Sequence, residues 1–544
     1  MGHEMIPMGT HRAIPALHIG LIALCLALAY AGSLNSPFIF DDGLNIVENP
    51  SIQTVFPLSG PLAHIPPGTS LNSRPLVNLT FALNYAVGGL SPWSYHLGNL
   101  LIHILAALAL YGIVRRTLLL ERPGQGFGEQ ARPLALACAL AWGLHPLQTQ
   151  AVTYVTQRCE SLMGLLFLAV LYCALRGWQA RRSWPWHTAA VLACLAGVWC
   201  KEVIVAAPVM VYFHDLVFLR KGRIVEPLKR SPWLYAGLAG CLALLAWNVL
   251  QGGTWSSGPG TVEYSSLEYA RTQPLVIFHY LRLAVWPAPL VLDYAWPVAS
   301  MAEAWPYLAA LAALACLASF GLVRAQAWGY CLAWFLVVLA PTSSIVPLRN
   351  LAFEHRMYLP LAGIICLAVP AGYLFLSRRC GFSMSRLRWS ALVLVLALGA
   401  ATVWRNLDYA SDIAIWRDTV EKRPNNARAH ANLGQALLAR GRVQEARDQL
   451  QAALALDPDH PTALLNLGVI MAQANDLGQA AALFQRAAEE PGHHLNAAKA
   501  LYNLGRVHLL RNDPAGALAL FKKALALRPG YQPAAEAVRA LEQQ

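Results

Sequence analysis

Charged side chains are scarce in this 544-residue chain: only 13% of its residues are Asp, Glu, Lys or Arg, whereas 56% are hydrophobic. Charged residues make up about a quarter of a typical soluble domain, so a soluble multidomain protein is excluded. A helix needs about 20 mostly apolar residues to cross a bilayer, and segments of this kind recur as far as Trp404. The chain is therefore predicted to be a multi-pass membrane protein with a water-soluble tail.

Paired cysteine motifs are also missing. The eleven cysteines contain no C-x-x-C spacing, and most of them lie in apolar segments. This pattern indicates neither a zinc site nor a disulfide framework. Cys159 and Cys200 both fall near predicted outer loop ends, so a bond between them is the alternative to two buried free thiols.

The soluble tail has almost no excess of cations. Residues 406–544 hold 15 Lys and Arg against 14 Asp and Glu, whereas residues 1–405 hold 26 against 15. Binding of nucleic acid would require a basic soluble face, so no nucleic-acid partner is expected. The excess belongs to the membrane part, where Lys and Arg gather in cytoplasmic loops.

Eleven membrane spans are predicted from the apolar segments. With a cytoplasmic N-terminus, the inner segments collect 18 Lys and Arg, and the outer segments up to Arg405 collect only eight, as the positive-inside rule requires. The polar loop 35–92 and everything after Arg405 are then extracytoplasmic. The spans are 14–34, 95–114, 133–148, 159–176, 186–200, 203–219, 232–251, 305–323, 328–341, 359–377 and 389–404.

Two segments leave a choice of topology. The sequence "AYA" at 29–31 has the form of a signal-peptidase site, but the apolar run before it is long for a signal peptide, so an uncleaved first helix is predicted. Residues 264–288 contain a short apolar run interrupted by His279 and Arg282, which favours a helix lying in the outer interface. If this helix crossed instead, every later loop would change side.

The tail contains a repeat. Residues 427–460 match the 34-residue tetratricopeptide (TPR) pattern, and further repeats occupy 461–497 and 498–531, with a capping helix after them. Small residues let the paired helices approach closely, and stacking buries a core that no single repeat could bury. The predicted fold class is mostly α: a polytopic membrane helix bundle over 1–405, followed by a TPR solenoid over 406–544.

Polar and charged residues recur at the predicted outer ends of the helices, where membrane proteins rarely leave charges without a function. A carboxylate there could take a proton from a hydroxyl nucleophile, while Arg and Lys could hold a phosphate. Such residues suit transfer of a group from a lipid phosphate to an outside acceptor. They come from five separate loops and are Asp41, Asp42, Arg74, His96, His145, Arg158, Glu160, Lys201, Glu202, Arg349, Glu354, His355, Arg356 and Tyr358.

Several short segments of the sequence resemble those of a known family. Together with the repeats, they resemble the transmembrane and TPR repeat-containing O-mannosyltransferases and their bacterial relatives, within the GT-C glycosyltransferase superfold. The resemblance covers nearly the whole chain. The segments are "DDGLNIVENP" at 41–50, "SRPLVNLTFALNY" at 73–85, "YHLGNLLIH" at 95–103, "HPLQTQAVTYVTQRCESL" at 145–162, "CKE" at 200–202 and "EHRMYLP" at 354–360.

The resemblance implies an inverting glycosyltransferase of the inner (plasma) membrane. It would transfer mannose or a similar hexose from a polyprenyl-phosphate donor to a protein Ser or Thr hydroxyl on the extracytoplasmic side, while the TPR repeats recruit the acceptor or a partner protein. No cofactor beyond this donor is firmly implied.

The resemblance also assigns roles to residues. Asp41 would be the catalytic base, and Asp42 would position the acceptor, hold a divalent ion or be structural. From their residue types, rather than from the resemblance, Arg158, Lys201 and Arg356 are predicted to bind the donor phosphate. The residues that would bind substrate or support the site are Arg74, His96, His145, Glu160, Glu202, Glu354, His355 and Tyr358.

Other interpretations stay open. Asp41 and Asp42 could merely cap the loop after the first helix, because turns favour Asp. Lys201 with Glu202, and Arg158 with Glu160, could be local ion pairs, Arg74 could anchor the chain at the interface, and His96 could be a packing residue. The whole chain could be a non-enzymatic membrane-anchored TPR scaffold for envelope assembly. Transport of a lipid-linked glycan would require charges at mid-bilayer, and few are visible.

Overall fold

The computed structural model describes residues 14–65, 69–120, 127–250, 264–489 and 494–543. The predicted leader with Arg12 and the inner loop with Arg122 lie outside these ranges. The described residues form helices and turns, without a strand among them. They divide into two compact units: Met1–Leu290 with Pro297–Ala410, and Val291–Trp296 with Ser411–Gln544.

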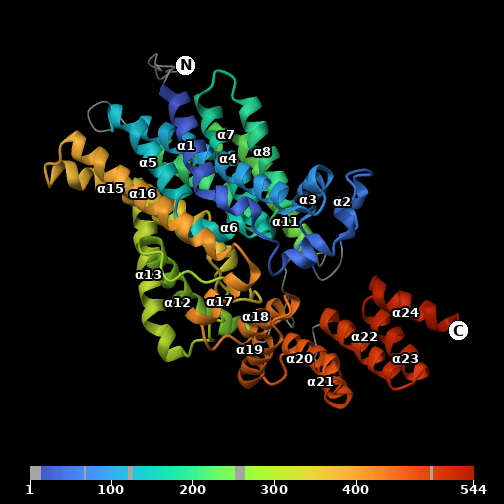
Figure 1. Cartoon of the computed structure of the whole chain (residues 1–544). Coiled ribbons are helices and arrows are strands. Elements are labelled where there is room, and N and C mark those ends of the chain that lie inside the picture. Colours follow the sequence, from blue (N-terminus) through green and yellow to red (C-terminus); the bar gives the residue numbers. More distant parts are fainter. Residues whose placement is uncertain (1–13, 66–68, 121–126, 251–263, 490–493, 544) are drawn as a thin grey trace. The chain divides into compact units, whose positions relative to one another are not determined.

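The first unit is a bundle of mainly apolar helices (Figure 1). Its central helix α4 packs against α5 and α7, α7 packs against α8, and α14 packs against α13 and α15. The helices are α1 (Ile14–Tyr30), α2 (Ser59–Ala63), α3 (Pro75–Gly88), α4 (Pro92–Leu119), α5 (Ala131–Gly143), α6 (Thr149–Thr153), α7 (Arg158–Gln179), α8 (Trp184–Val198), α9 (Ala206–His214), α10 (Glu226–Arg230), α11 (Pro232–Leu250), α12 (Ser266–Val285), α13 (Met301–Val323), α14 (Ala327–Leu339), α15 (Pro360–Arg378) and α16 (Met384–Asp408).

Each of the eleven predicted spans contains a helix. Among the described residues, eight helical segments are long and apolar enough to cross a membrane. Three predicted spans are shorter: Trp184–Val198 and Ala327–Thr342 are apolar helices of 10–17 residues, and α5 has 13 residues. The eight segments are Ala16–Asn35, Pro92–Leu119, Val155–Gln179, Glu202–Leu219, Pro232–Leu250, Met301–Val323, Pro360–Arg378 and Met384–Asp408.

The segment 264–288 does form a helix, α12, which begins with a capping box between Ser265 and Glu268. One of its faces is buried through Tyr269, Val276 and Tyr280, and it is not among the long apolar segments. Its place in the membrane interface stays a prediction.

The second unit is a series of helix pairs typical of TPR repeats: α18 pairs with α19, α20 with α21, and α22 with α23. A Cβ added to Gly434 would lie 2.7 Å from Leu450, and one added to Gly468 would lie 2.6 Å from Phe484, so glycine is what permits the close helix approach. The helices are α17 (Asp412–Lys422), α18 (Ala427–Ala439), α19 (Val443–Leu456), α20 (Pro461–Gln473), α21 (Leu477–Glu489), α22 (His494–Leu510), α23 (Pro514–Leu527) and α24 (Gln532–Glu542).

The predicted fold class, an α-helical bundle of apolar membrane helices followed by a C-terminal TPR solenoid, is confirmed by these two units. The short segment 291–296 between α12 and α13 belongs to the second unit. Its Asp293 carboxylate accepts hydrogen bonds from Arg428 Nε at 2.6 Å and Nη2 at 2.8 Å. The repeat pattern in the sequence did not indicate this contact.

Candidate functional site

The segment 154–160 connects several of the predicted site residues. It comprises Tyr154, the turn η6 (Val155–Gln157) and the first turn of α7. Tyr154 and Thr156 contact the acidic pair, and Glu160 contacts Lys201. Residues that are far apart in the sequence are therefore gathered around one short connection in the first unit.

Asp42 is fully buried, with no exposed surface. Its Oδ1 accepts hydrogen bonds from Thr156 N at 2.7 Å and Thr156 Oγ1 at 2.5 Å, and its Oδ2 accepts one from Ile39 N at 3.0 Å. Burial raises the pKa of Asp42 to about 7, because these three hydrogen bonds offset only part of the lost hydration. Oδ1 thus ties the loop after α1 to η6, and Oδ2 bonds the backbone of the loop itself.

Asp41 has a different environment, because it is only partly buried. Its backbone N–H donates to the Tyr154 hydroxyl at 3.1 Å, and its carbonyl accepts from the Asn45 side chain at 2.8 Å. Burial, together with the two neighbouring carboxylates, raises the pKa of the Tyr154 phenol well above its usual value. The backbone of Asp41 is thus fixed, and its partly exposed carboxylate also forms a hydrogen bond with the Tyr154 hydroxyl.

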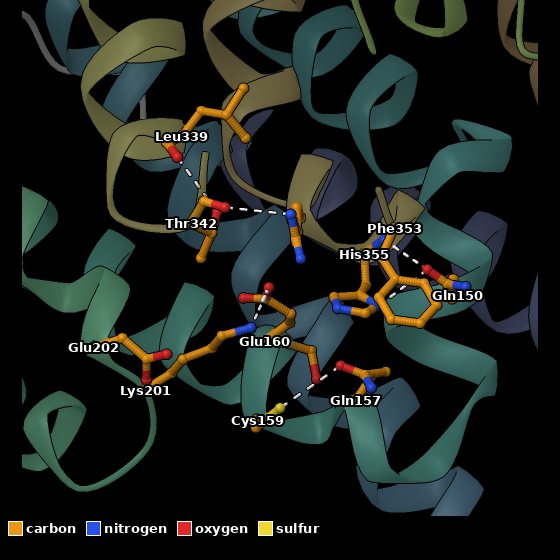
Figure 2. A network of polar contacts seen from close by, with 12 residues as sticks. Gln150, Gln157, Cys159, Glu160, Lys201, Glu202, Leu339, Thr342, Phe353 and His355 are labelled. Carbon is orange, nitrogen blue, oxygen red and sulfur yellow. Dashed lines mark hydrogen bonds and ion pairs between the residues drawn. The ribbon is translucent and has the colours of Figure 1, made fainter. Parts of the chain in front are cut away.

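Two buried ion pairs form the second part of the site. Lys201 Nζ lies 2.6 Å from Glu160 Oε1, and Arg74 Nη2 lies 3.9 Å from Glu202 Oε2. Figure 2 shows Lys201 reaching toward Glu160, with Glu202 beside it. The local pairs considered from the sequence, Lys201 with Glu202 and Arg158 with Glu160, are therefore replaced by pairs between separate segments.

Arg74 is the less tightly paired of these two cations. Its Nη1 donates to Cys159 Sγ at 3.4 Å, and its buried Nε has no hydrogen-bond partner among the described residues. Cys159 and Cys200 are both free and buried, so the thiol alternative is confirmed and no disulfide joins them.

His355 lies beside the ion pairs. Its Nδ1 and backbone N lie 3.0 and 2.8 Å from Gln150 Oε1, and its ring lies 4.8 Å from that of Phe353 (Figure 2). Burial and the nearby cations Lys201, Arg356 and Arg74 lower the pKa of His355 well below its usual value. This shift favours the neutral form of the imidazole, and the neighbouring Glu354 is fully buried.

The guanidinium of Arg158 is buried and hydrogen-bonded to the protein, so it is not available as a free cation. It is 1% exposed, and its guanidinium donates to Asn99 at 2.6 Å, Asn84 at 2.5 Å and the Tyr95 carbonyl at 2.7 Å. A Cβ on Gly98 would lie 2.9 Å from Arg158 Nη2, so the α4 glycine makes room for it. These contacts join α3, α4 and α7 and favour a supporting role over the predicted phosphate contact.

Arg356 is enclosed in a similar way. Its guanidinium donates to the carbonyls of Thr342 at 3.2 Å, Leu351 at 3.1 Å and Asn350 at 2.5 Å, and to the Tyr269 hydroxyl at 3.2 Å. It therefore ties the 350–357 loop to α12 and to the end of α14. The buried carbonyls leave little of this guanidinium for a ligand.

Tyr358, His96 and His145 belong to the surrounding packing. The Tyr358 hydroxyl lies 3.0 Å from His103 Nδ1, and His96 Nε2 donates to the Ser36 carbonyl at 2.9 Å. His145 Nε2 donates to the Ala284 carbonyl at 3.2 Å. Each of these rings supports the loops around the site rather than the ion pairs themselves.

Sequence reasoning did not single out Tyr154, Thr156 and Gln150, although all three lie in the quoted segment 145–162. Uncharged residues carry no signal of their own, and only their contacts with Asp41, Asp42 and His355 reveal their role. No group of three His, Cys, Asp or Glu residues within the described ranges has the arrangement of a metal site. A divalent ion at Asp42 would have to displace the donors that hold its carboxylate.

Comparisons with known proteins agree with this picture. A tetratricopeptide repeat model matches residues 403–461 and 441–494, and a second one matches 498–531. Protein O-mannosyl-transferase Tmtc3 of Drosophila melanogaster is 26% identical over 82% of this chain and 56% of its own length. Protein O-mannosyl-transferase TMTC1 of Homo sapiens is 27% identical over 84% of this chain and 57% of its own length.

The chain's homologues are protein O-mannosyl-transferases. A further relative, Protein O-mannosyl-transferase F38B6.6 of Caenorhabditis elegans, is 24% identical over 81% of this chain and 62% of its own length. The chain thus spans little more than half the length of the curated relatives it matches. Among solved structures, ArnT from Cupriavidus metallidurans bound to undecaprenyl phosphate is 16% identical over 90% of this chain and 80% of that one, with a TM-score of 0.43; a likeness of this size decides neither fold nor ligand.

Proposed function

We propose that this protein is a GT-C-type glycosyltransferase that moves mannose or a similar hexose from a polyprenyl-phosphate donor to a Ser or Thr hydroxyl of a protein. The acceptor and the sugar would lie on the extracytoplasmic side of the inner membrane. The proposal rests on the different environments of the two aspartates: Asp42 is buried and holds the loop in place, whereas Asp41 has a fixed backbone and a partly exposed carboxylate. The O-mannosyl-transferase homologues support the same activity.

Asp41 is assigned the role of general base. Its carboxylate takes the proton of the acceptor hydroxyl as the oxygen attacks C1 of the sugar. The bond between C1 and the phosphate oxygen breaks, its electron pair leaves with the lipid phosphate, and the configuration at C1 inverts. Tyr154 and Thr156 hold the two aspartates in place and need not contact the substrate.

Arg74 and Lys201 are better placed for the leaving phosphate than Arg158 or Arg356, which are enclosed by protein acceptors. Arg74 has an unpartnered Nε and a long ion pair, so a phosphate can bind it without breaking a short contact. Cations stabilise a phosphate as its charge develops. In kinetic assays Arg74→Gln should therefore raise KM for the donor, and an unchanged KM would exclude this contact.

The decisive experiment uses Asp41→Asn. The purified variant should lose roughly 100-fold or more of its transfer rate, because a general base commonly contributes that much. The assay measures movement of radiolabelled sugar from polyprenyl-phosphate mannose, and from other polyprenyl-phosphate hexoses, to a Ser/Thr-rich peptide.

Thermal unfolding of Asp41→Asn should stay close to that of the unaltered protein, because asparagine keeps a side-chain oxygen that can accept the hydrogen bond of the Tyr154 hydroxyl. Undiminished transfer by Asp41→Asn would remove the proposed base. A non-enzymatic scaffold predicts that the unaltered chain transfers none of these sugars.

A further inference from the structure

An apolar pocket of about 390 Å³ lies in the first unit, between α4, α14 and α15. Known small-molecule sites have volumes of about 300–1,000 Å³. The pocket reaches Leu118 in the last turn of α4, whereas His96, beside the acidic pair's loop, lies in the first turns of that helix. The 28 residues of α4 correspond to roughly 40 Å of helix, so this pocket is separate from the site around the aspartates.

Two polar side chains in the lining of this pocket have an unpaired atom. His214 Nδ1 and the Tyr330 hydroxyl are buried and have no hydrogen-bond partner among the described residues, and both residues line the pocket. His214 is 1% exposed and Tyr330 is 8% exposed, so bulk water does not replace the missing partners. Because a buried polar group without a partner costs free energy, a ligand that bonds to these two atoms would bind favourably.

The contact of His214 with Thr117 shows which role Nδ1 can play. The Thr117 hydroxyl donates its one hydrogen to the Ile113 carbonyl at 2.9 Å, and it lies 2.9 Å from His214 Nε2. The hydroxyl therefore accepts from Nε2–H, and in the neutral ring Nδ1 is then a hydrogen-bond acceptor. The Tyr330 hydroxyl can donate, so the lining offers one unused acceptor and one unused donor.

Neighbouring aromatic rings hold both side chains in place. The His214 ring lies 4.7 Å from that of Phe218 and 5.5 Å from that of Tyr330, with the second pair in an edge-to-face arrangement. The Tyr330 ring lies 5.3 Å from that of Phe218 in turn. Closely packed rings resist reorientation, so the unused donor and acceptor belong to adjacent, fixed side chains of one apolar pocket.

We propose that this pocket binds an uncharged lipid that carries a free hydroxyl group. The hydroxyl of the lipid accepts a hydrogen bond from the Tyr330 hydroxyl and donates one to His214 Nδ1, since a hydroxyl can do both at once. The hydrocarbon chain of the lipid lies along apolar lining residues such as Leu110, Leu171 and Leu367. The proposal does not rest on the proposed glycosyl transfer.

Other lipid groups match the pocket less well. The hydrocarbon tail of the proposed polyprenyl-phosphate donor offers no hydrogen bond to His214 or Tyr330. An anionic headgroup would find one Lys or Arg among the described lining residues, Arg378, which is exposed at the end of α15. A neutral hydroxyl uses both unpaired atoms without the need for a buried cation.

The test uses the full-length protein in phosphatidylcholine nanodiscs. The probe is tetradecanol with a diazirine in its chain and a terminal alkyne, which is cross-linked by light and quantified by in-gel fluorescence. Mass spectrometry should place the cross-links on α4, α14 or α15. Unlabelled tetradecanol should compete with the probe about fivefold better than its methyl ether, because the ether cannot donate to His214 Nδ1 and one hydrogen bond contributes a factor of about this size.

Tyr330→Phe removes the unpaired hydroxyl and keeps the aromatic ring. It should raise the probe concentration for half-maximal labelling about fivefold, because one hydrogen bond to the lipid is lost. Its Tm should not fall, since the hydroxyl has no partner in the protein. Tyr212→Phe is the matched control, because the Tyr212 hydroxyl donates to the Ile224 carbonyl and Tyr212 is not among the lining residues; it should be labelled as the unaltered protein is.

Absence of saturable labelling, equal labelling of Tyr330→Phe and the unaltered protein, or equal competition by the alcohol and its ether would each overturn the proposal. Stronger competition by myristate than by tetradecanol would also overturn it, because Arg378 would then select an anionic lipid. These outcomes are separable from that of the transfer assay. Asp41→Asn should be labelled normally while failing to transfer sugar, and absence of transfer by the unaltered protein would leave the lipid site standing.

Discussion

Asp41 and Asp42 are chemically identical neighbours with opposite environments. Asp41 lies in a turn, and Asp42 has helical backbone angles just before the helical turn η2 (Gly43–Val47). Asp42 enters the protein interior, whereas Asp41 stays partly exposed. Phe40, just before them, has a φ of 48°, a conformation that costs a non-glycine residue energy and is concentrated at functional sites. The backbone before Asp41 is therefore held in an unfavourable geometry by the contacts of Asp42 and Tyr154.

Asp42→Asn should destabilise the protein, because an amide cannot accept on both atoms. If the amide oxygen keeps the Thr156 contacts, its NH₂ faces the Ile39 N–H and a buried donor is left unpaired. A buried unpaired donor costs about 1–3 kcal/mol. Thermal unfolding of the detergent-solubilised protein should detect this as a lower Tm.

Asp41→Asn is the matched control for this prediction, since it makes the same chemical change one residue away. Its Tm should stay at that of the unaltered protein. Should Asp42→Asn unfold at the same temperature while abolishing transfer, Asp42 would belong to the reaction rather than to the scaffold.

At this scale, sequence reasoning found charged groups more readily than their partners. The residue types at the outer helix ends led to Lys201, Glu160 and Arg74, but nearness in sequence pairs Lys201 with Glu202, whereas the fold pairs it with Glu160 across 41 positions. Contacts of this separation depend on how helices pack, which residue spacing does not encode. The enclosure of Arg158 and Arg356 was hidden for the same reason.

At the scale of elements, the short segment 154–160 contacts three separate loops. Its residues touch the loop after α1, the start of α3 through Arg74, and the turn before η7 (Glu202–Val205). A short connection that fixes several loops at once lets those loops vary in length without moving the site. The TPR helices, by contrast, were predictable from sequence, because the 34-residue period repeats its core residues in each pair.

The segment 291–296 was not predictable, since it lies far from the repeats in sequence. Burial alone would raise the pKa of the Asp293 carboxyl, but the Arg428 guanidinium outweighs it, and the pKa is lowered. A carboxyl with a lowered folded-state pKa stabilises the fold above its unfolded pKa of about 3.9. That stability should be lost as the pH falls below this value and through the folded-state pKa.

Hydrogen exchange of α17 and α18, followed by mass spectrometry in the full-length protein, can measure this pH dependence. Exchange corrected for its intrinsic pH dependence should speed up as the pH falls below about 3.9. Arg428→Gln should speed exchange already at pH 7, because removal of one partner from a buried pair costs about 3 kcal/mol. Arg440→Gln, on an exposed pair with Asp412, is the control and should change little; an Arg428 variant with unaltered exchange would show that the pair contributes nothing to this region.

At the scale of the whole molecule, the proposed function depends on which side of the membrane each end of the helix bundle faces. The apolar pocket of about 390 Å³ bounded by α4, α14 and α15 lies at the helix ends opposite to the aspartates, as its lining residues Leu118, Ala327 and Arg378 indicate. The two ends of the bundle thus differ in chemistry: one is a polar, ion-paired site, and the other is an apolar groove beside predicted inner loops.

The charge distribution predicts that the aspartates face outward, together with the TPR unit. The predicted inner segments hold 18 Lys and Arg residues, and the predicted outer segments hold eight. Such a bias orients short loops toward the cytoplasm. In a bacterial host, alkaline phosphatase fused after Arg379, between α15 and α16, should therefore be inactive, and the same enzyme fused after Glu542 should be active. Green fluorescent protein at the two positions should give the reverse. If both fusions report the same side, α16 does not cross; if the pattern is exchanged, the carboxylate of Asp41 faces the cytoplasm and an extracytoplasmic acceptor could not reach it.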